Sequence, residues 1–242
     1  MEKAIHESMN AALRTLEKQA IIANNLANIS TIGFKEEFNY FIRNKNSQDI
    51  NKKYYNFSSG NFIQTERKLD LIVQDNGWLV TKDQNGQEAY TKNGHITINE
   101  NGKLTIQNHE LVLNEGNIKI PHGIDLKILP DGTIKQIQKN RDKIIESQIA
   151  TLKLVRISNN SLIKKENGLF YNKKKLFNKK IILPHDNSIR IKSETLEASN
   201  VNPTKNMIDM ISNARQFEMN MKIISICDQN IERANQLFNI NN

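Results

Sequence analysis

Residues 202–238 read NPTKNMIDMISNARQFEMNMKIISICDQNIERANQLF. Asn202 and Pro203 are typical of a helix start, because an asparagine side chain caps free N–H groups and proline fits the first helical position. No proline or glycine follows before Phe238, so the stretch predicts one helix about 55 Å long. One stripe along it recurs at alternating steps of three and four: Met207, Met210, Ala214, Phe217, Met221, Ile224, Asp228, Ile231, Asn235 and Phe238.

The N-terminal end of the chain has the same pattern. We expect a helix over about residues 3–28 that ends before Gly33. Its stripe runs through Ile5, Met9, Ala12, Leu16, Gln19, Ala23 and Leu26. An average spacing of 3.5 residues keeps one stripe facing a neighbouring helix. The two helices therefore need partners, either each other within a self-contained monomer or helices of other copies. Periodicity alone leaves both possibilities open.

The middle of the chain has the alternation of β-strands. Leu69, Leu71 and Val73 recur at every second position, and further short alternating pairs follow up to Ile189 and Ile191. Asn-Gly pairs at 85–86, 93–94 and 101–102 predict hairpin turns, because both residues tolerate a positive φ. An antiparallel domain of many short strands is expected here.

These patterns predict an α+β protein with long terminal helices, pairing as in a coiled coil, on either side of an all-β domain. The expected parts are an N-terminal assembly helix at 1–33, an extended connector at 34–66, a central β domain at 67–198 and a C-terminal assembly helix at 199–242. Within the connector, the Asn- and Lys-rich stretch 44–56 is expected to be extended or weakly ordered.

Composition narrows the function classes. The formal net charge is +8, and its excess lies in the middle, notably at Lys164–Lys165, Lys173–Lys175 and Lys179–Lys180. Such lysines form either a solvated surface or a patch for nucleic acid. The single cysteine, Cys227, excludes an intramolecular disulfide. No segment approaches the ~20 apolar residues of a membrane span, and the N-terminus lacks a signal-peptide pattern. Composition alone therefore points to the cytoplasm.

No catalytic or cofactor motif stands out. The five histidines have no metal-ligand spacing, and no phosphate-binding loop is present. Asp70 and Asp75 are close in sequence, but their spacing alone supports no mechanism. We expect neither an enzyme nor a bound cofactor or metal.

Three segments, in order, resemble the signatures of bacterial flagellar rod and hook proteins. The first is NNLANISTIGFK at residues 24–35. The second spans residues 69–80 and continues at YTKNG, residues 90–94. The third begins with LEASNVNP at residues 196–203 and continues to Lys222. Residues 74–79 and 215–219 are more similar to the proximal rod members than to the distal rod or hook members, which remain the alternative. Ile32 and Lys205 depart from the pattern, which often has proline and an acidic residue there.

The resemblance implies a structural subunit of the proximal flagellar rod, the helical drive shaft that crosses the periplasm. Its expected partners are copies of itself, other rod subunits and the flagellar type III export apparatus, with no cleaved signal peptide, no nucleic acid and no membrane insertion. This expected localisation in the periplasm-spanning rod replaces the cytoplasmic one that composition suggested. The distant alternative for the function is a basic nucleic-acid-binding protein. The expected assembly interface comprises Ile5, Met9, Leu16, Asn24, Asn25, Leu26, Asn28, Gly33, Phe34, Asn200, Val201, Asn202, Met207, Met210, Ile211, Phe217, Met221, Ile224 and Ile231.

Overall fold

The computed structural model describes residues 2–42, 50–74, 76–116, 118–121, 124–140, 143–173 and 182–239. The chain divides into two compact units. The helix unit comprises Met1–Ser30, Lys35–Ser58 and Asn200–Asn242, and the β unit comprises Thr31–Phe34 and Ser59–Ser199. Helices at both ends of the chain and antiparallel strands between them confirm the predicted α+β class.

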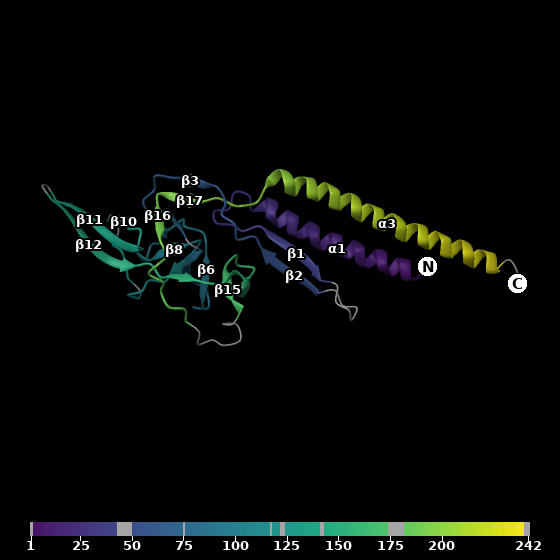
Figure 1. The fold of residues 1–242 in the computed structure, drawn as a ribbon, viewed down its shortest axis with the longest axis horizontal. Coiled ribbons are helices and arrows are strands. Elements are labelled where there is room, and N and C mark those ends of the chain that lie inside the picture. The colour runs from purple at the N-terminus through teal and green to yellow at the C-terminus, as the bar shows by residue number, and fades with distance from the viewer. Residues whose placement is uncertain are drawn as a thin grey trace. The chain divides into compact units, whose positions relative to one another are not determined.

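Two long helices and one hairpin build the helix unit. Helix α1 spans Glu2–Ala27 and helix α3 spans Pro203–Asn239, close to the predicted bounds. The two helices lie side by side and run antiparallel (Figure 1). The predicted cap at the start of α3 is present, because the Lys205 N–H donates to Oδ1 of Asn202 at 3.0 Å.

The segment 34–66, which we expected to be an extended connector, contains paired strands in its described parts. Strands β1 (Glu37–Ile42) and β2 (Ile50–Tyr55) form an antiparallel hairpin with Glu37 opposite Tyr55, and β1 packs against α1. The ring of Phe38 stacks on that of Tyr54 with centroids 6.0 Å apart. Such cross-strand pairs stabilise a hairpin even in a segment rich in Asn and Lys. Residues 43–49 of the expected weakly ordered stretch lie outside the described residues.

Short antiparallel strands build the β unit, as predicted. They are β3 (Phe62–Gln64), β4 (Leu71–Val73), β5 (Gly77–Lys82), β6 (Glu88–Thr91), β7 (Thr97–Ile98), β8 (Leu104–Ile106), β9 (His109–Leu111), β10 (Asp125–Ile128), β11 (Thr133–Asn140), β12 (Lys143–Thr151), β13 (Leu154–Arg156), β14 (Leu162–Lys164), β15 (Phe170–Asn172), β16 (Ile191–Ser193) and β17 (Thr195–Glu197), with a 3-10 turn at Asn159–Ser161. The largest sheet has the order β14-β15-β6-β5-β9-β8-β7, with β13 also on β5; β10-β11-β12, β16-β4 and β17-β3 form smaller sheets.

Two of the three predicted Asn-Gly hairpin turns are present. Gly86 and Gly102 have φ values of +73° and +74° and join β5 to β6 and β7 to β8. The third prediction is wrong, because Gly94 joins β6 to β7, which are not neighbours in the sheet. A Cβ at Gly94 would collide with the carbonyl oxygen of Leu71. This glycine is required for close backbone approach and not for a turn.

An apolar core fills the β unit. The side chains that are fully enclosed include Trp78, Leu71, Leu79, Ile96, Ile106, Ile134, Leu152 and Leu154. All of these except Trp78 belong to one core, to which the largest sheet, β10-β11-β12 and β16-β4 all contribute residues. The β unit therefore encloses a large apolar core within itself, although Phe62, Ile63, Ile145, Ile163 and Ile182 are exposed.

Candidate assembly interface

A seam between α1 and α3 is formed by residues at alternating steps of three and four. On α3 the buried or half-buried positions of the seam are Asn206, Met210, Asn213, Phe217, Asn220, Ile224, Cys227, Ile231 and Ala234; on α1 they are Ile5, Ser8, Ala12, Thr15, Gln19, Ile22 and Leu26. The spacing is the one predicted, but on α3 every second seam position is small or polar, and on α1 four consecutive positions are (Ser8, Ala12, Thr15 and Gln19). Three of these positions on α3 are asparagines seven residues apart.

The predicted stripes coincide with the seam only at alternate positions. Met210 and Phe217 lie in the seam, whereas Met207 and Met221 are exposed. On α1, Ile5 lies in the seam. Where two adjacent residues could both belong to the stripe, the prediction used the more apolar one. It therefore has Met207 and Met221 where the structure has Asn206 and Asn220. Adjacent helical residues point about 100° apart, so this choice rotates the predicted face away from the observed one.

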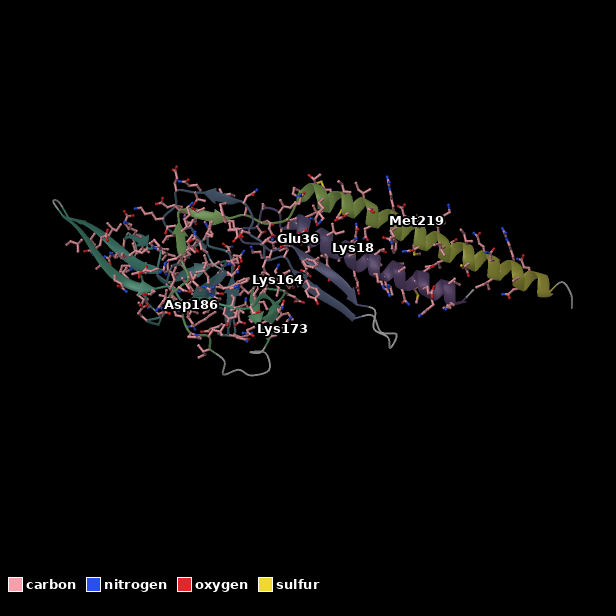
Figure 2. All side chains as sticks on the ribbon, in the orientation of Figure 1. Lys18, Glu36, Lys164, Lys173, Asp186 and Met219 are labelled. Atoms are coloured by element: carbon pink, nitrogen blue, oxygen red, sulfur yellow. The ribbon has the colours of Figure 1, made fainter. Side chains whose placement is uncertain are left out.

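The residues left outside form an exposed apolar surface on each helix. We call them the outer residues: Met9, Leu13 and Leu16 on α1, and Met207, Ile208, Ile211, Met219, Met221, Ile223 and Ile226 on α3. They are between 46% and 61% exposed, and Figure 2 labels Met219 on α3. A large exposed apolar surface marks a site of interaction. Leu13, Ile208, Met219, Ile223 and Ile226 were missed by the sequence analysis, although their apolar character was visible.

The first and third signature segments meet at the end of the hairpin within the helix unit. The side-chain amide of Asn25 pairs with the backbone of Glu37, donating to its carbonyl at 2.8 Å and accepting from its N–H at 2.9 Å. Asn200 accepts from the Glu36 N–H at 2.7 Å and donates to the Asn56 carbonyl at 2.8 Å. Each asparagine thus replaces a missing strand neighbour, which satisfies buried backbone groups.

Asn206 completes this network from the first turn of α3. Its Nδ2 donates to Oε1 of Glu36 at 3.1 Å, and its Oδ1 accepts from Nδ2 of Asn25 at 3.5 Å. Figure 2 labels Glu36 near the hairpin and the ends of the two helices. The Lys53 ammonium pairs with the buried carboxylate of Glu37 at 3.1 Å. The signature asparagines therefore make contacts within the chain, a role that sequence reasoning did not assign to them.

The predicted interface residues consequently lie in different environments. Six belong to the seam (Ile5, Leu26, Met210, Phe217, Ile224 and Ile231), and five are outer residues (Met9, Leu16, Met207, Ile211 and Met221). Asn24, Asn25, Asn28 and Asn200 bond within the helix unit, Val201 is buried and Asn202 caps α3. Gly33 and Phe34 belong to the β unit. There the Gly33 N–H donates to the Glu197 carbonyl at 2.7 Å.

Described lysines of the basic segment contact other groups in the β unit. The Lys164 ammonium lies 4.0 Å from the centroid of the Phe34 ring, and the Lys165 ammonium lies 4.2 Å from that of Tyr171. Lys173 donates to the Asn160 carbonyl at 3.1 Å. The Phe34 and Tyr171 rings therefore already make cation–π contacts with lysines of this chain. Lys174, Lys175, Lys179 and Lys180 lie outside the described residues.

The part of the chain that the structure describes offers neither a metal site nor a membrane-spanning helix. No group of three histidine, cysteine, aspartate or glutamate side chains is arranged to hold a metal ion there. Over the same residues, neither helix is long and apolar enough to cross a membrane. Of the suggested carboxylate pair, Asp70 is buried and accepts from His95 Nδ1 at 2.8 Å, whereas Asp75 lies outside the described residues.

Comparison with known proteins agrees with the three signature segments. Residues 7–35 match the family described as "Flagella basal body rod protein", residues 72–136 match "Flagellar hook protein FlgE/F/G D1 domain" and residues 192–237 match "Flagellar basal body rod FlgEFG protein C-terminal". Each terminal helix is thus matched by its own family model, and a third model matches part of the β unit.

Whole proteins match over the full length. The chain is 66% identical to the flagellar basal-body rod protein FlgF of Buchnera aphidicola subsp. Schizaphis graminum, covering 100% of both chains. It is 37% identical to FlgF of Salmonella typhimurium, over 99% of this chain and 100% of the relative. The flagellar basal-body rod protein FlgG of Buchnera aphidicola subsp. Acyrthosiphon pisum is 26% identical, over 90% of this chain. The predicted family is confirmed: the chain belongs to the flagellar basal-body rod proteins.

Proposed function

We propose that this chain is a structural subunit of the flagellar rod, in its proximal part, and that it assembles through the outer residues of α1 and α3. Its partners are copies of itself and other rod subunits. The greater identity to FlgF than to FlgG supports the proximal assignment over the distal one. The same proposal places the chain in the periplasm-spanning rod, reached through the flagellar type III export apparatus without a cleaved signal peptide.

The observation that carries the assembly proposal is the exposed apolar surface of the helix unit. Fully burying a Leu, Ile or Met side chain stabilises a complex by roughly 1.5–3 kcal/mol. Association costs about 4–15 kcal/mol in lost freedom. A contact that covers several outer residues on each helix therefore gives net stabilisation. The seam, with its 3.5-residue spacing, would pack as a coiled coil beneath this surface.

The geometry of the outer residues favours an open assembly. One helix carries Met9, Leu13 and Leu16, and the other carries its own distinct set. When one copy uses the surface of α1 and its neighbour uses that of α3, the contact is heterologous. Repeated heterologous contacts that do not close into a ring produce a helical filament. A rod requires an assembly of this kind.

Ile211→Asp tests this proposal, because it places a charge at an exposed apolar position. We expect the wild-type chain to form larger species with rising concentration in sedimentation velocity, and Ile211→Asp to remain monomeric because burying an unpaired charge is costly. The matched control is Ser212→Asp, a neighbouring exposed position on the same helix, which should associate as the wild type does.

Trp78 is the only tryptophan of the chain and lies in the β unit. Its fluorescence on urea unfolding should be the same in all three proteins. Equal association of Ile211→Asp and the wild type would contradict assembly through the outer residues. Equal loss of association in the Ser212→Asp control would also contradict the assignment to this face.

A further inference from the structure

Burial of apolar surface alone does not explain which residues of α3 face α1 in the seam. The helix offers two overlapping stripes of the same spacing, which share Met210, Phe217, Ile224 and Ile231. In its first half the observed seam adds Asn206, Asn213 and Asn220, whereas the alternative stripe adds Met207, Ala214 and Met221. In the second half the observed seam adds Cys227 and Ala234, whereas the alternative stripe adds Asp228 and Asn235. Turning α3 by about 50° about its axis exchanges one set for the other.

In the first half of α3, burial of apolar surface favours the alternative stripe. It would remove Met207 and Met221 from water and return the asparagine amides to it. The observed seam also encloses Oδ1 of Asn213 and Nδ2 of Asn220, which have no hydrogen-bond partner among the described residues. Buried polar atoms of this kind destabilise a seam. Some specific interaction must therefore select the asparagine face.

Asn213 provides that interaction in the middle of the seam. Its side chain is 3% exposed, and its Nδ2 donates to the Thr15 carbonyl at 2.6 Å and to Oε1 of Gln19 at 2.9 Å. Both amide hydrogens are thus used on α1. At the start of α3, Asn206 bonds to Glu36 and Asn25 in the same way. Any rotation of α3 breaks both sets of bonds.

We infer that Asn206 and Asn213 fix the rotation of α3 against α1, and that they do so to keep the methionine side of α3 available to another subunit. A polar residue in a helical seam is known to specify one arrangement at a cost in stability. Here the arrangement that it specifies exposes Met207 and Met221. The inference rests on the proposed function, since it states how the assembly surface is kept outside.

Asn213→Asp tests this role, because the substitution keeps the shape of the side chain and removes both donors. The resulting carboxylate faces the Thr15 carbonyl oxygen, which repels it, while the Gln19 amide can turn to donate one bond in place of the two that are lost. We expect α3 to turn, carrying the carboxylate to water and Met207 and Met221 into the seam. The control is Asn230→Asp, which makes the same chemical change at an exposed position of α3.

The measurement is methionine oxidation of the full chain by dilute peroxide, followed by mass spectrometry of each site. In the wild type and in Asn230→Asp, Met207 and Met221 should oxidise severalfold faster than half-buried Met210. In Asn213→Asp this difference should disappear while the helical circular dichroism is retained. An unchanged pattern of oxidation at unchanged helicity would overturn the inference.

A second variant tests the inference if Asn213→Asp reduces the helical circular dichroism. Adding Gln19→Lys places an ammonium opposite the new carboxylate, and should restore both the helicity and the wild-type oxidation pattern. Failure of this rescue would also overturn the inference. Oxidation is measured at a dilution where the chain is monomeric, so its outcome is independent of assembly. If the oxidation results hold and Ile211→Asp still associates, the proposed function fails and the rotation lock stands.

Discussion

The two units of this chain differ in how completely they bury their apolar residues. In the β unit, Trp78 and Leu79 are enclosed, and the surface carries the lysines. In the helix unit, Asn206 and Asn213 lie inside, while methionine, leucine and isoleucine side chains lie outside. A unit that buries its apolar residues is complete by itself, and a unit that exposes them is complete only when another surface covers it. The difference separates a unit whose core is closed within the monomer from a unit whose outer residues we propose to be covered on assembly.

Leu79→Ala and Leu13→Ala test this comparison most directly, since they remove the same atoms from each unit. Leu79 is 0% exposed, whereas Leu13 is 53% exposed. We expect Leu79→Ala to lower the free energy of unfolding by about 2–5 kcal/mol, because it leaves a cavity in the core. Leu13→Ala should change it by less than about 0.5 kcal/mol. Urea unfolding followed by Trp78 fluorescence and by circular dichroism measures both.

The comparison would fail if the two leucines cost the monomer the same stability. It would also fail if Leu13→Ala left concentration-dependent association unchanged, because the outer residues would then serve no contact. Leu79→Ala provides the control for association, since it alters no residue of the helix unit.

Asn202→Ala examines how far the helix unit depends on local rather than tertiary interactions. Its Oδ1 accepts from the Lys205 N–H, and losing such a cap costs roughly 0.5–2 kcal/mol. We expect a loss of about 1 kcal/mol in the helical transition seen by circular dichroism, with no change in Trp78 fluorescence. Asn235→Ala, at an exposed position of the same helix, should change neither signal. Equal effects of the two asparagines would contradict the cap.

The smallest expected effect concerns a turn of the β unit. The Thr133 N–H donates to Oδ1 of Asp131 at 3.0 Å, and this bond lowers the pKa of the Asp131 carboxyl. A lowered pKa in the folded state stabilises the fold above the unfolded pKa of about 3.9, and the stabilisation is lost as the pH falls through the folded pKa. The contribution is small because Asp131 is exposed and solvent screens it.

The Asp131→Asn variant should therefore differ from the wild type in its free energy of unfolding only while the Asp131 carboxyl of the wild type is ionised. The free energy of urea unfolding, read from Trp78 fluorescence, should differ by a constant amount near neutral pH. The two curves should converge as the pH falls below about 4. Curves that stay parallel to the lowest pH at which the protein folds would show that this carboxylate has no such role.

Local signals in the sequence predicted much of the fold. Asn202 and Pro203 marked the start of α3, because capping involves only neighbouring residues. Gly86 and Gly102 marked turns for the same reason. The three signature segments predicted the family, and assembly through the two terminal helices stays a prediction. These features depend on short stretches of chain that have few alternative conformations.

Other features depended on residues far apart in the chain. The sequence by itself determined two helices with a 3.5-residue repeat, a turn-rich β segment and the family. Only the tertiary structure decided which of two overlapping stripes forms the seam, because Asn213 is preferred over its apolar neighbour through bonds to Thr15 and Gln19 on the other helix. It also decided that residues 37–55 pair as a hairpin and that Gly94 serves close approach to Leu71. A side chain's neighbours across space set its energy in these cases, and spacing along the chain does not record them.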